Sequence, residues 1–143
     1  MIVGLDANII CYAFDDAYPE HEKLKDLLLN LSPDNKIALN PTTIHEAYHT
    51  LVFSQKWAPK ESADALRVLL NNPYAEFFNQ TRKTSIIALN LCVQYKLGGR
   101  DALIAANYIA NKTPLVYTHD KALLKLQKIT WKNTNLTYKD PLI

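Results

Sequence analysis

Short apolar runs alternate along the chain with segments in which apolar residues recur every three or four positions. A run of four or five apolar residues, bounded by turn-forming residues, is typical of a buried strand. Helical spacing with a polar opposite face is typical of a surface helix. The runs predict strands over residues 2–5, 36–40, 74–78 and 113–118, with edge strands in the tail around Trp131 and Leu136.

The segments between these strands carry the signals of helices. Asn8 is expected to cap a short helix through Phe14, and Tyr18-Pro19 to open a second helix. Pro41 and Pro59 suit the first turns of two more helices. In the helix after Pro59, Val68 is expected on the inner face with its apolar neighbours. Further helices are predicted over residues 84–97, 101–110 and 121–128.

Strands that alternate with helices predict an α/β fold with a mainly parallel sheet covered by helices on both faces, a three-layer α/β/α sandwich. The chain has 143 residues, the length of one ordinary domain, so residues 1–143 are expected to form a single domain. In open sheets of this kind, ligands bind beyond the carboxyl ends of the strands. The chemistry of this chain is therefore expected at that edge.

Composition excludes several classes of protein. The only glycines are Gly4, Gly98 and Gly99, too few for a glycine-rich phosphate loop. Cys11 and Cys92 cannot build a disulfide framework and have no CxxC partner, so they indicate buried thiols in a reducing compartment. No segment has the roughly 20 apolar residues of a membrane helix. We therefore expect a cytoplasmic protein that does not enter a membrane.

Four carboxylates stand at ends of predicted elements that converge on one edge of the sheet. Asp6 directly follows the first strand, and Asp120 lies just beyond the strand over 113–118. Glu46 lies in the first turns of the helix after strand 36–40, and Asp101 opens a helix after two glycines. Four neighbouring carboxylates repel one another unless a cation neutralises them. Oxygen ligands favour Mg²⁺ or Mn²⁺, although each carboxylate alone also suits a helix N-terminus.

The runs around these carboxylates resemble, in order and over nearly the full length, the successive motifs of PIN-domain ribonucleases. A single-domain chain of this length is similar to VapC-type toxins, which cleave RNA and are held inactive by a partner antitoxin. The runs are Leu5-Asp6-Ala7-Asn8, Thr42-Thr43-Ile44-His45-Glu46, Arg100-Asp101-Ala102-Leu103-Ile104-Ala105-Ala106 and Val116-Tyr117-Thr118-His119-Asp120-Lys121.

The resemblance implies a PIN-like fold and a metal-dependent endoribonuclease that hydrolyses RNA phosphodiester bonds. It implies that an antitoxin binds the chain, and exposed apolar surface would also suit a homodimer. In this family a further acidic residue often follows the last motif aspartate, but here the stretch reads Asp120-Lys121-Ala122-Leu123. One metal, or a weaker second site, is therefore expected. The resemblance assigns one or two Mg²⁺ or Mn²⁺ to Asp6, Glu46, Asp101 and Asp120 as catalytic ligands, with Asn8 and Thr118 hydrogen-bonding those ligands.

Other functions within the same resemblance stay open. The chain could be an RNA-processing nuclease outside toxin–antitoxin systems. It could also be a module on this fold that binds a partner without hydrolysis.

Positive charge is concentrated in the second part of the chain. Residues 77–143 hold 10 of the 16 Lys and Arg residues but only 3 of the 14 Asp and Glu residues. Four lysines in this part are spaced by four, three and four residues, which predicts that they lie on one face of a helix that begins beside Asp120. This lysine stripe either binds RNA phosphates or is an ordinary solvated helix face. The stripe consists of Lys121, Lys125, Lys128 and Lys132.

A competing motif overlaps the second carboxylate run. His45-Glu46-Ala47-Tyr48-His49 matches HExxH, in which two histidines on one helix face bind Zn²⁺ and the glutamate acts as the base of a peptidase. This zinc-hydrolase hypothesis lacks an obvious third ligand. It also leaves Asp6, Asp101 and Asp120 without a role, so the sequence favours the nuclease.

Overall fold

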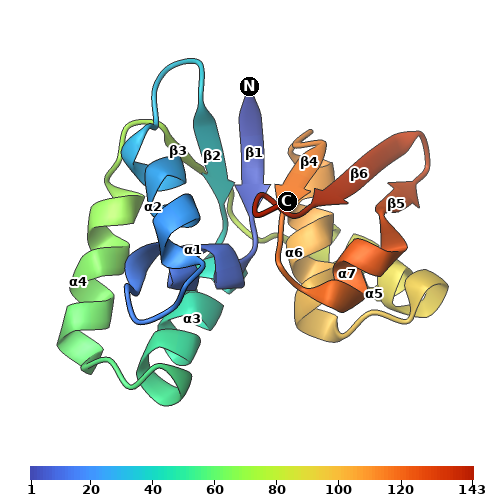
Figure 1. Ribbon diagram of the computed structural model, residues 1–143. Coiled ribbons are helices and arrows are strands. Elements are labelled where there is room, and N and C mark those ends of the chain that lie inside the picture. Colours follow the sequence, from blue (N-terminus) through green and yellow to red (C-terminus); the bar gives the residue numbers. More distant parts are fainter.

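Six strands form one sheet through the middle of the molecule, in the order β3-β2-β1-β4-β6-β5 (Figure 1). The computed structural model describes residues 1–143. All neighbouring strands run parallel except β5, which is antiparallel to β6. The expected mainly parallel sheet is thereby confirmed. The strands are β1 (Ile2–Leu5), β2 (Lys36–Leu39), β3 (Ala75–Phe77), β4 (Leu115–Tyr117), β5 (Lys128–Trp131) and β6 (Thr134–Lys139).

The helices begin where local chemistry allows their first N–H groups to be satisfied. Pro41 and Pro59 occupy first-turn positions as predicted, and the Asn40 side chain accepts a hydrogen bond from the Thr43 N–H. No helix has the length and apolar composition needed to cross a membrane. The helices are α1 (Ala7–Phe14), α2 (His21–Leu29), α3 (Pro41–His49), a π-helical turn η1 (Thr50–Ser54), α4 (Pro59–Leu70), α5 (Arg82–Tyr95), α6 (Gly99–Ala110) and α7 (Lys121–Leu126).

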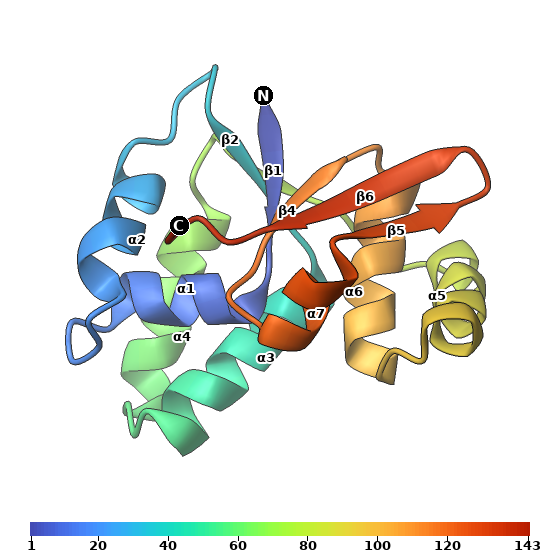
Figure 2. The ribbon, with the colours of Figure 1, turned by 45° about the vertical axis from the view of Figure 1, so that its right-hand side comes forward.

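Alternating side chains on the strands divide the interior into two cores, one on each face of the sheet (Figure 2). Leu5 and Ile37 belong to the core that α1 to α4 cover. Ala38 and Val116 belong to the core that α5 and α6 cover. Because successive residues of a strand point to opposite faces, these apolar runs bury both sides of the sheet. The three-layer α/β/α arrangement is therefore confirmed.

Several local expectations were wrong. Asp6, not Asn8, caps α1, because its carboxylate is the first acceptor after β1 and takes the Ala7 N–H at 2.8 Å. The second helix begins at His21 because the preceding residues form turns. Val68 is 74% exposed, since α4 buries a different face.

The tail is also placed differently from the expectation. β6 lies inside the sheet between β4 and β5, so of the two tail strands only β5 is an edge strand. The hairpin partner of β6 is β5, and its other neighbour is the central parallel strand β4.

Candidate metal and nuclease site

The strand order reverses between β1 and β4, and this is where the site lies. β1 connects through α1 and α2 to β2 on one side, while β4 pairs with it on the other side. Asp6 follows β1, and its N–H donates to the Tyr117 carbonyl at 3.0 Å at the end of β4. Such a reversal leaves a crevice beyond the carboxyl ends of the strands. The sheet thus brings residues near position 6 and near position 118 together.

Thr118 joins the first and last of the predicted carboxylate positions. Its hydroxyl donates to Asp6 Oδ2 at 2.8 Å and accepts from the Asp120 N–H at 3.1 Å. The other Asp6 oxygen accepts from the Ala7 N–H. Thr118 is fully buried, so this arrangement fixes the Asp6 carboxylate in one orientation.

The charges of the four predicted carboxylates act on one another. Burial raises the pKa of Asp6 to about 6, and the charges of Asp101 and Glu46 push it in the same direction against the Thr118 and Ala7 hydrogen bonds. Burial also raises the pKa of Asp101, to which the charge of Asp120 adds. Each of these shifts is in the direction that neighbouring negative charges produce.

Glu46 lies in this site with a single cationic neighbour. Arg100 Nη1 is 3.7 Å from Glu46 Oε1, whereas Glu46 Oε2 is buried without any hydrogen-bond partner. Burial raises the pKa of Glu46, Arg100 opposes this and Asp101 reinforces it. A buried carboxylate oxygen without a donor is costly, so this atom has an unused capacity for a cation.

The residues at this edge fit a hard divalent cation. Every candidate ligand is a carboxylate oxygen, the ligand type preferred by Mg²⁺ and Mn²⁺. No three His, Cys, Asp or Glu side chains already stand close enough together to hold an ion. The carboxylates would therefore have to close around it, with the free Glu46 oxygen and the crowded Asp6 among them.

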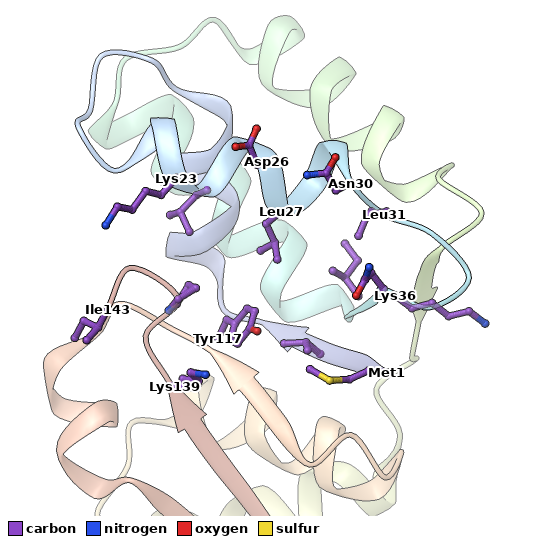
Figure 3. A pocket seen from close by; sticks show the side chains of 15 residues that line it. Met1, Lys23, Asp26, Leu27, Asn30, Leu31, Lys36, Tyr117, Lys139 and Ile143 are labelled. Atoms are coloured by element: carbon purple, nitrogen blue, oxygen red, sulfur yellow. The ribbon is translucent and has the colours of Figure 1, made fainter.

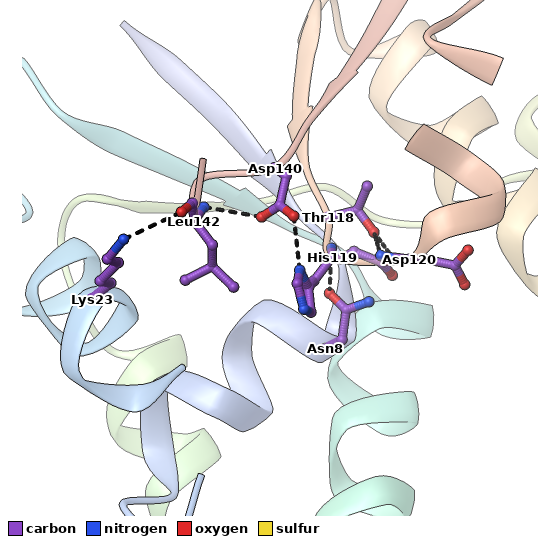
Figure 4. A network of polar contacts seen from close by, with 8 residues as sticks. Asn8, Lys23, Thr118, His119, Asp120, Asp140 and Leu142 are labelled. Carbon is purple, nitrogen blue, oxygen red and sulfur yellow. Dashed lines mark hydrogen bonds and ion pairs between the residues drawn. The ribbon is translucent and has the colours of Figure 1, made fainter. Parts of the chain in front are cut away.

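Asn8 does not contact any of the four carboxylates, contrary to the expectation. Its side-chain oxygen accepts from the His119 N–H at 3.2 Å (Figure 4). It therefore positions the loop between Thr118 and Asp120 through the backbone. Thr118, in contrast, does contact Asp6 directly.

His119 and Asp140 form a pair that the sequence analysis missed. His119 Nδ1 lies 2.8 Å from Asp140 Oδ2, and Asp140 Oδ1 accepts from the Leu142 N–H (Figure 4). Asp140 directly follows β6, which runs parallel to β4. Asp6 was predicted because it directly follows a parallel strand, beyond whose carboxyl end ligands bind. The same rule would have predicted Asp140, because β6 ends at the same edge of the sheet.

The two histidines of the HExxH match do not join Glu46 in a ligand set. His45 and His49 lie on the exposed side of α3, while Glu46 is 21% exposed and faces Arg100. The His49 ring packs against Phe53, with centroids 4.8 Å apart. Since both histidines face solvent and Glu46 pairs with Arg100 instead, the structure gives the zinc-hydrolase hypothesis no support.

The predicted lysine stripe is wrong. α7 ends at Leu126 because Gln127 has a positive φ of 66°, which cannot continue the helix. Lys121 and Lys125 share α7, but Lys128 begins β5. The fourth member, Lys132, stands in the turn after β5 with its ammonium group over the Trp131 ring. Only Lys121 and Lys125 extend positive charge along one helix from Asp120.

A pocket of about 390 Å³ lies between α2 and the sheet (Figure 3). Tyr117 and Lys139, the last residues of β4 and β6, contribute to its wall. None of the four predicted metal ligands lines it. The candidate site is therefore the carboxyl edge itself and not this pocket.

Residues 3–129 match the PIN domain family, and the chain belongs to this family. The comparison with curated proteins gave no match.

Solved structures with the same fold include several toxin–antitoxin proteins. VapBC2 from Rickettsia felis, bound to a DNA fragment from its promoter, is similar with a TM-score of 0.69 at 21% identity, over 98% of each chain. The sarcin–ricin loop cleaving toxin VapC20 from Mycobacterium tuberculosis has a TM-score of 0.70 at 14% identity, over 85% of this chain and 91% of that one. VapBC-1 from nontypeable Haemophilus influenzae is similar over 100% of both chains, with a TM-score of 0.64 at 16% identity.

Proposed function

We propose that this chain is a Mg²⁺- or Mn²⁺-dependent endoribonuclease and the toxin of a toxin–antitoxin pair. The observation that supports the nuclease is the electrostatic coupling of Asp6, Glu46, Asp101 and Asp120 at the carboxyl edge of a PIN domain. The structural likeness to VapBC proteins and to an RNA-cleaving toxin supports the toxin role and an antitoxin partner.

The four carboxylates would hold the ion. When bound, it supplies activation of water and neutralisation of the charge that develops on the phosphodiester. Thr118 orients Asp6 through its hydroxyl, and Asn8 fixes the loop before Asp120. Lys121 and Lys125 extend the site with positive charge that suits RNA phosphates.

The nuclease is tested by incubating the purified chain with RNA in the presence of Mg²⁺, Mn²⁺, Zn²⁺ or a chelator. We expect cleavage with Mg²⁺ or Mn²⁺, loss of cleavage with the chelator, and no cleavage by Asp101→Asn. The matched control is the double variant His45→Gln/His49→Gln, which should cleave normally because both histidines are exposed on α3 and do not pair with any of the four carboxylates. Full activity of Asp101→Asn would refute the proposal.

The toxin role needs a separate test. Induced expression of the wild-type chain in a bacterial host should stop growth, and expression of Asp101→Asn should not. If the purified chain cleaves RNA but its expression leaves growth unaffected, the chain is an RNA-processing nuclease of another kind.

A further inference from the structure

The ion pair between Arg100 and Glu46 is not built like a structural salt bridge. Arg100 is the second residue of α6, its side chain is 72% exposed, and its guanidinium is 3.7 Å from only one Glu46 oxygen. Guanidinium groups bind carboxylates best through two parallel hydrogen bonds at about 2.8 Å. A loose pair with one exposed partner contributes little to stability. Arg100 therefore lies near Glu46 but is only weakly bound to it.

The same arginine lies beside two carboxylates, because it pairs with Glu46 and directly precedes Asp101 in α6. Its charge opposes the rise in pKa of both Glu46 and Asp101, and no other cationic side chain has this effect on Asp6, Glu46 or Asp101. Arg100 is thus the cation that reduces the mutual repulsion of these carboxylates within the chain itself.

Glu46 nevertheless keeps one coordination position free. Its Oε2 atom is buried and has no hydrogen-bond partner, while Arg100 approaches only Oε1. A single side chain thus has one oxygen near a solvent-exposed cation and a second oxygen that is buried and unpaired. This is the arrangement expected of a carboxylate that can change its cationic partner.

We propose that Arg100 is a resident counter-cation of this site and that Glu46 exchanges it for the divalent ion when the ion binds. The inference rests on the proposed metal-dependent function. Before binding, Arg100 makes the crowding of Glu46 and Asp101 tolerable. On binding, the arginine and the ion carry like charges, so the guanidinium turns out toward solvent, where it is already largely exposed.

The exchange makes Arg100 a positioning residue that weakens metal binding. A positive charge near the site repels the incoming ion and competes with it for Glu46. Its removal should therefore tighten the binding of Mn²⁺, by roughly tenfold, the order of effect that one exposed unit charge near the ion would have. A purely structural arginine would have the opposite effect or none, because its loss would loosen the site.

The test is isothermal titration of the purified metal-free chain with Mn²⁺ at neutral pH. We expect Arg100→Gln to bind Mn²⁺ about tenfold more tightly than the wild type. Arg100→Lys, which keeps the charge, should stay close to the wild type. Arg82→Gln is the matched control, because it removes the same charge from an exposed first-turn position of α5. Its affinity should be unchanged.

Thermal unfolding gives a second readout that does not depend on RNA cleavage. Mn²⁺ should raise the Tm of Arg100→Gln by more than that of the wild type, since tighter binding stabilises more at the same ion concentration.

The outcomes separate the two proposals. If the wild type binds Mn²⁺ and Asp101→Asn does not, but Arg100→Gln binds with unchanged or weaker affinity, the exchange is wrong and the metal site stands. If the wild type itself binds neither Mn²⁺ nor Mg²⁺, the proposed function fails and the exchange fails with it.

Discussion

Gly4 of β1 lies directly against the ring of Tyr108 of α6, and the absence of a side chain at Gly4 makes room for that ring. A Cβ atom at position 4 would lie 2.8 Å from Cε2 of Tyr108. The Tyr108 hydroxyl donates to the carbonyls of Leu5 at 2.7 Å and Ala38 at 3.0 Å, so α6 is attached to both β1 and β2. Since Asp6 follows β1 and Asp101 lies on α6, this contact also sets the distance between two of the carboxylates.

Replacement of Gly4 by alanine should destabilise the protein. The ring cannot retreat without losing both hydrogen bonds, and overpacking of this kind costs about 1–3 kcal/mol. Urea denaturation measures the change. The matched control is Gly99→Ala, since a Cβ at that position meets nothing within 4 Å and alanine favours a helix. Equal stabilities of the two variants would contradict this account of Gly4.

Loss of the Thr118 hydroxyl should impair the site more than the fold. Thr118→Val keeps the shape of the side chain but removes the hydrogen bond to Asp6 and the acceptor for the Asp120 N–H. Groups that orient metal ligands in this way are typically worth 10- to 100-fold in metal affinity or activity. Titration with Mn²⁺ and an RNA cleavage assay measure the loss, and Thr118→Ser should restore most of it. A fully active valine variant would show that Asp6 needs no such orientation.

The stability of the metal-free protein should fall as the pH rises from about 4 to about 6. Burial raises the pKa of Asp6 from 3.8 to about 6 in the folded chain, so the folded state binds more protons than the unfolded state in this window. Stability is greatest below the window and levels off above it. A shift of this size corresponds to about 3 kcal/mol at most.

Asp6→Asn provides the check on this pH dependence. It should be more stable than the wild type at neutral pH without metal, and the difference should vanish near pH 4. Chemical denaturation across this pH range in the presence of a chelator measures both curves. Parallel curves for the two proteins would rule out Asp6 as the source of the dependence.

Replacement of Lys96 by glycine should stabilise the protein. It ends α5 in the left-handed region, with φ of 57° and ψ of 37°, a conformation that disfavours residues with a side chain. Lys96→Gly should stabilise the protein by about 0.5–1 kcal/mol. Lys83→Gly is the matched control within α5, where glycine should be destabilising. Calorimetric unfolding shows whether each variant is more or less stable than the wild type, and a loss of stability in Lys96→Gly would contradict the prediction.

The sequence predicted best where burial alone decides the structure. The apolar runs that form β1, β2 and β4 are buried on both faces of the sheet. They therefore predict these strands and also the carboxyl edge where Asp6 lies. The end of α7 was missed because no glycine or proline marks it. Gln127 ends the helix with a positive φ, and the following residues form β5, in which Ile129 is buried.

The contacts within the site were harder to predict than its place. The position of Glu46 on α3 follows from its spacing after β2, but its partner Arg100 depends on how α3 and α6 pack. The pairing of His119 with Asp140 depends on β6 entering the sheet beside β4. Periodicity along one segment does not carry such information, because the packing of distant elements determines it.

The location of β6 between β4 and β5 affects how the chain is made. Domains generally fold as units during translation, and β4 gains its second neighbour only after residue 139 has been added. The Asp140 carboxylate that holds His119 arrives at the same moment. A ribosome making this protein would therefore complete the last strand before the loop around Asp120 acquires its final support, so the nascent polypeptide cannot mature at this edge until residue 140 has been added.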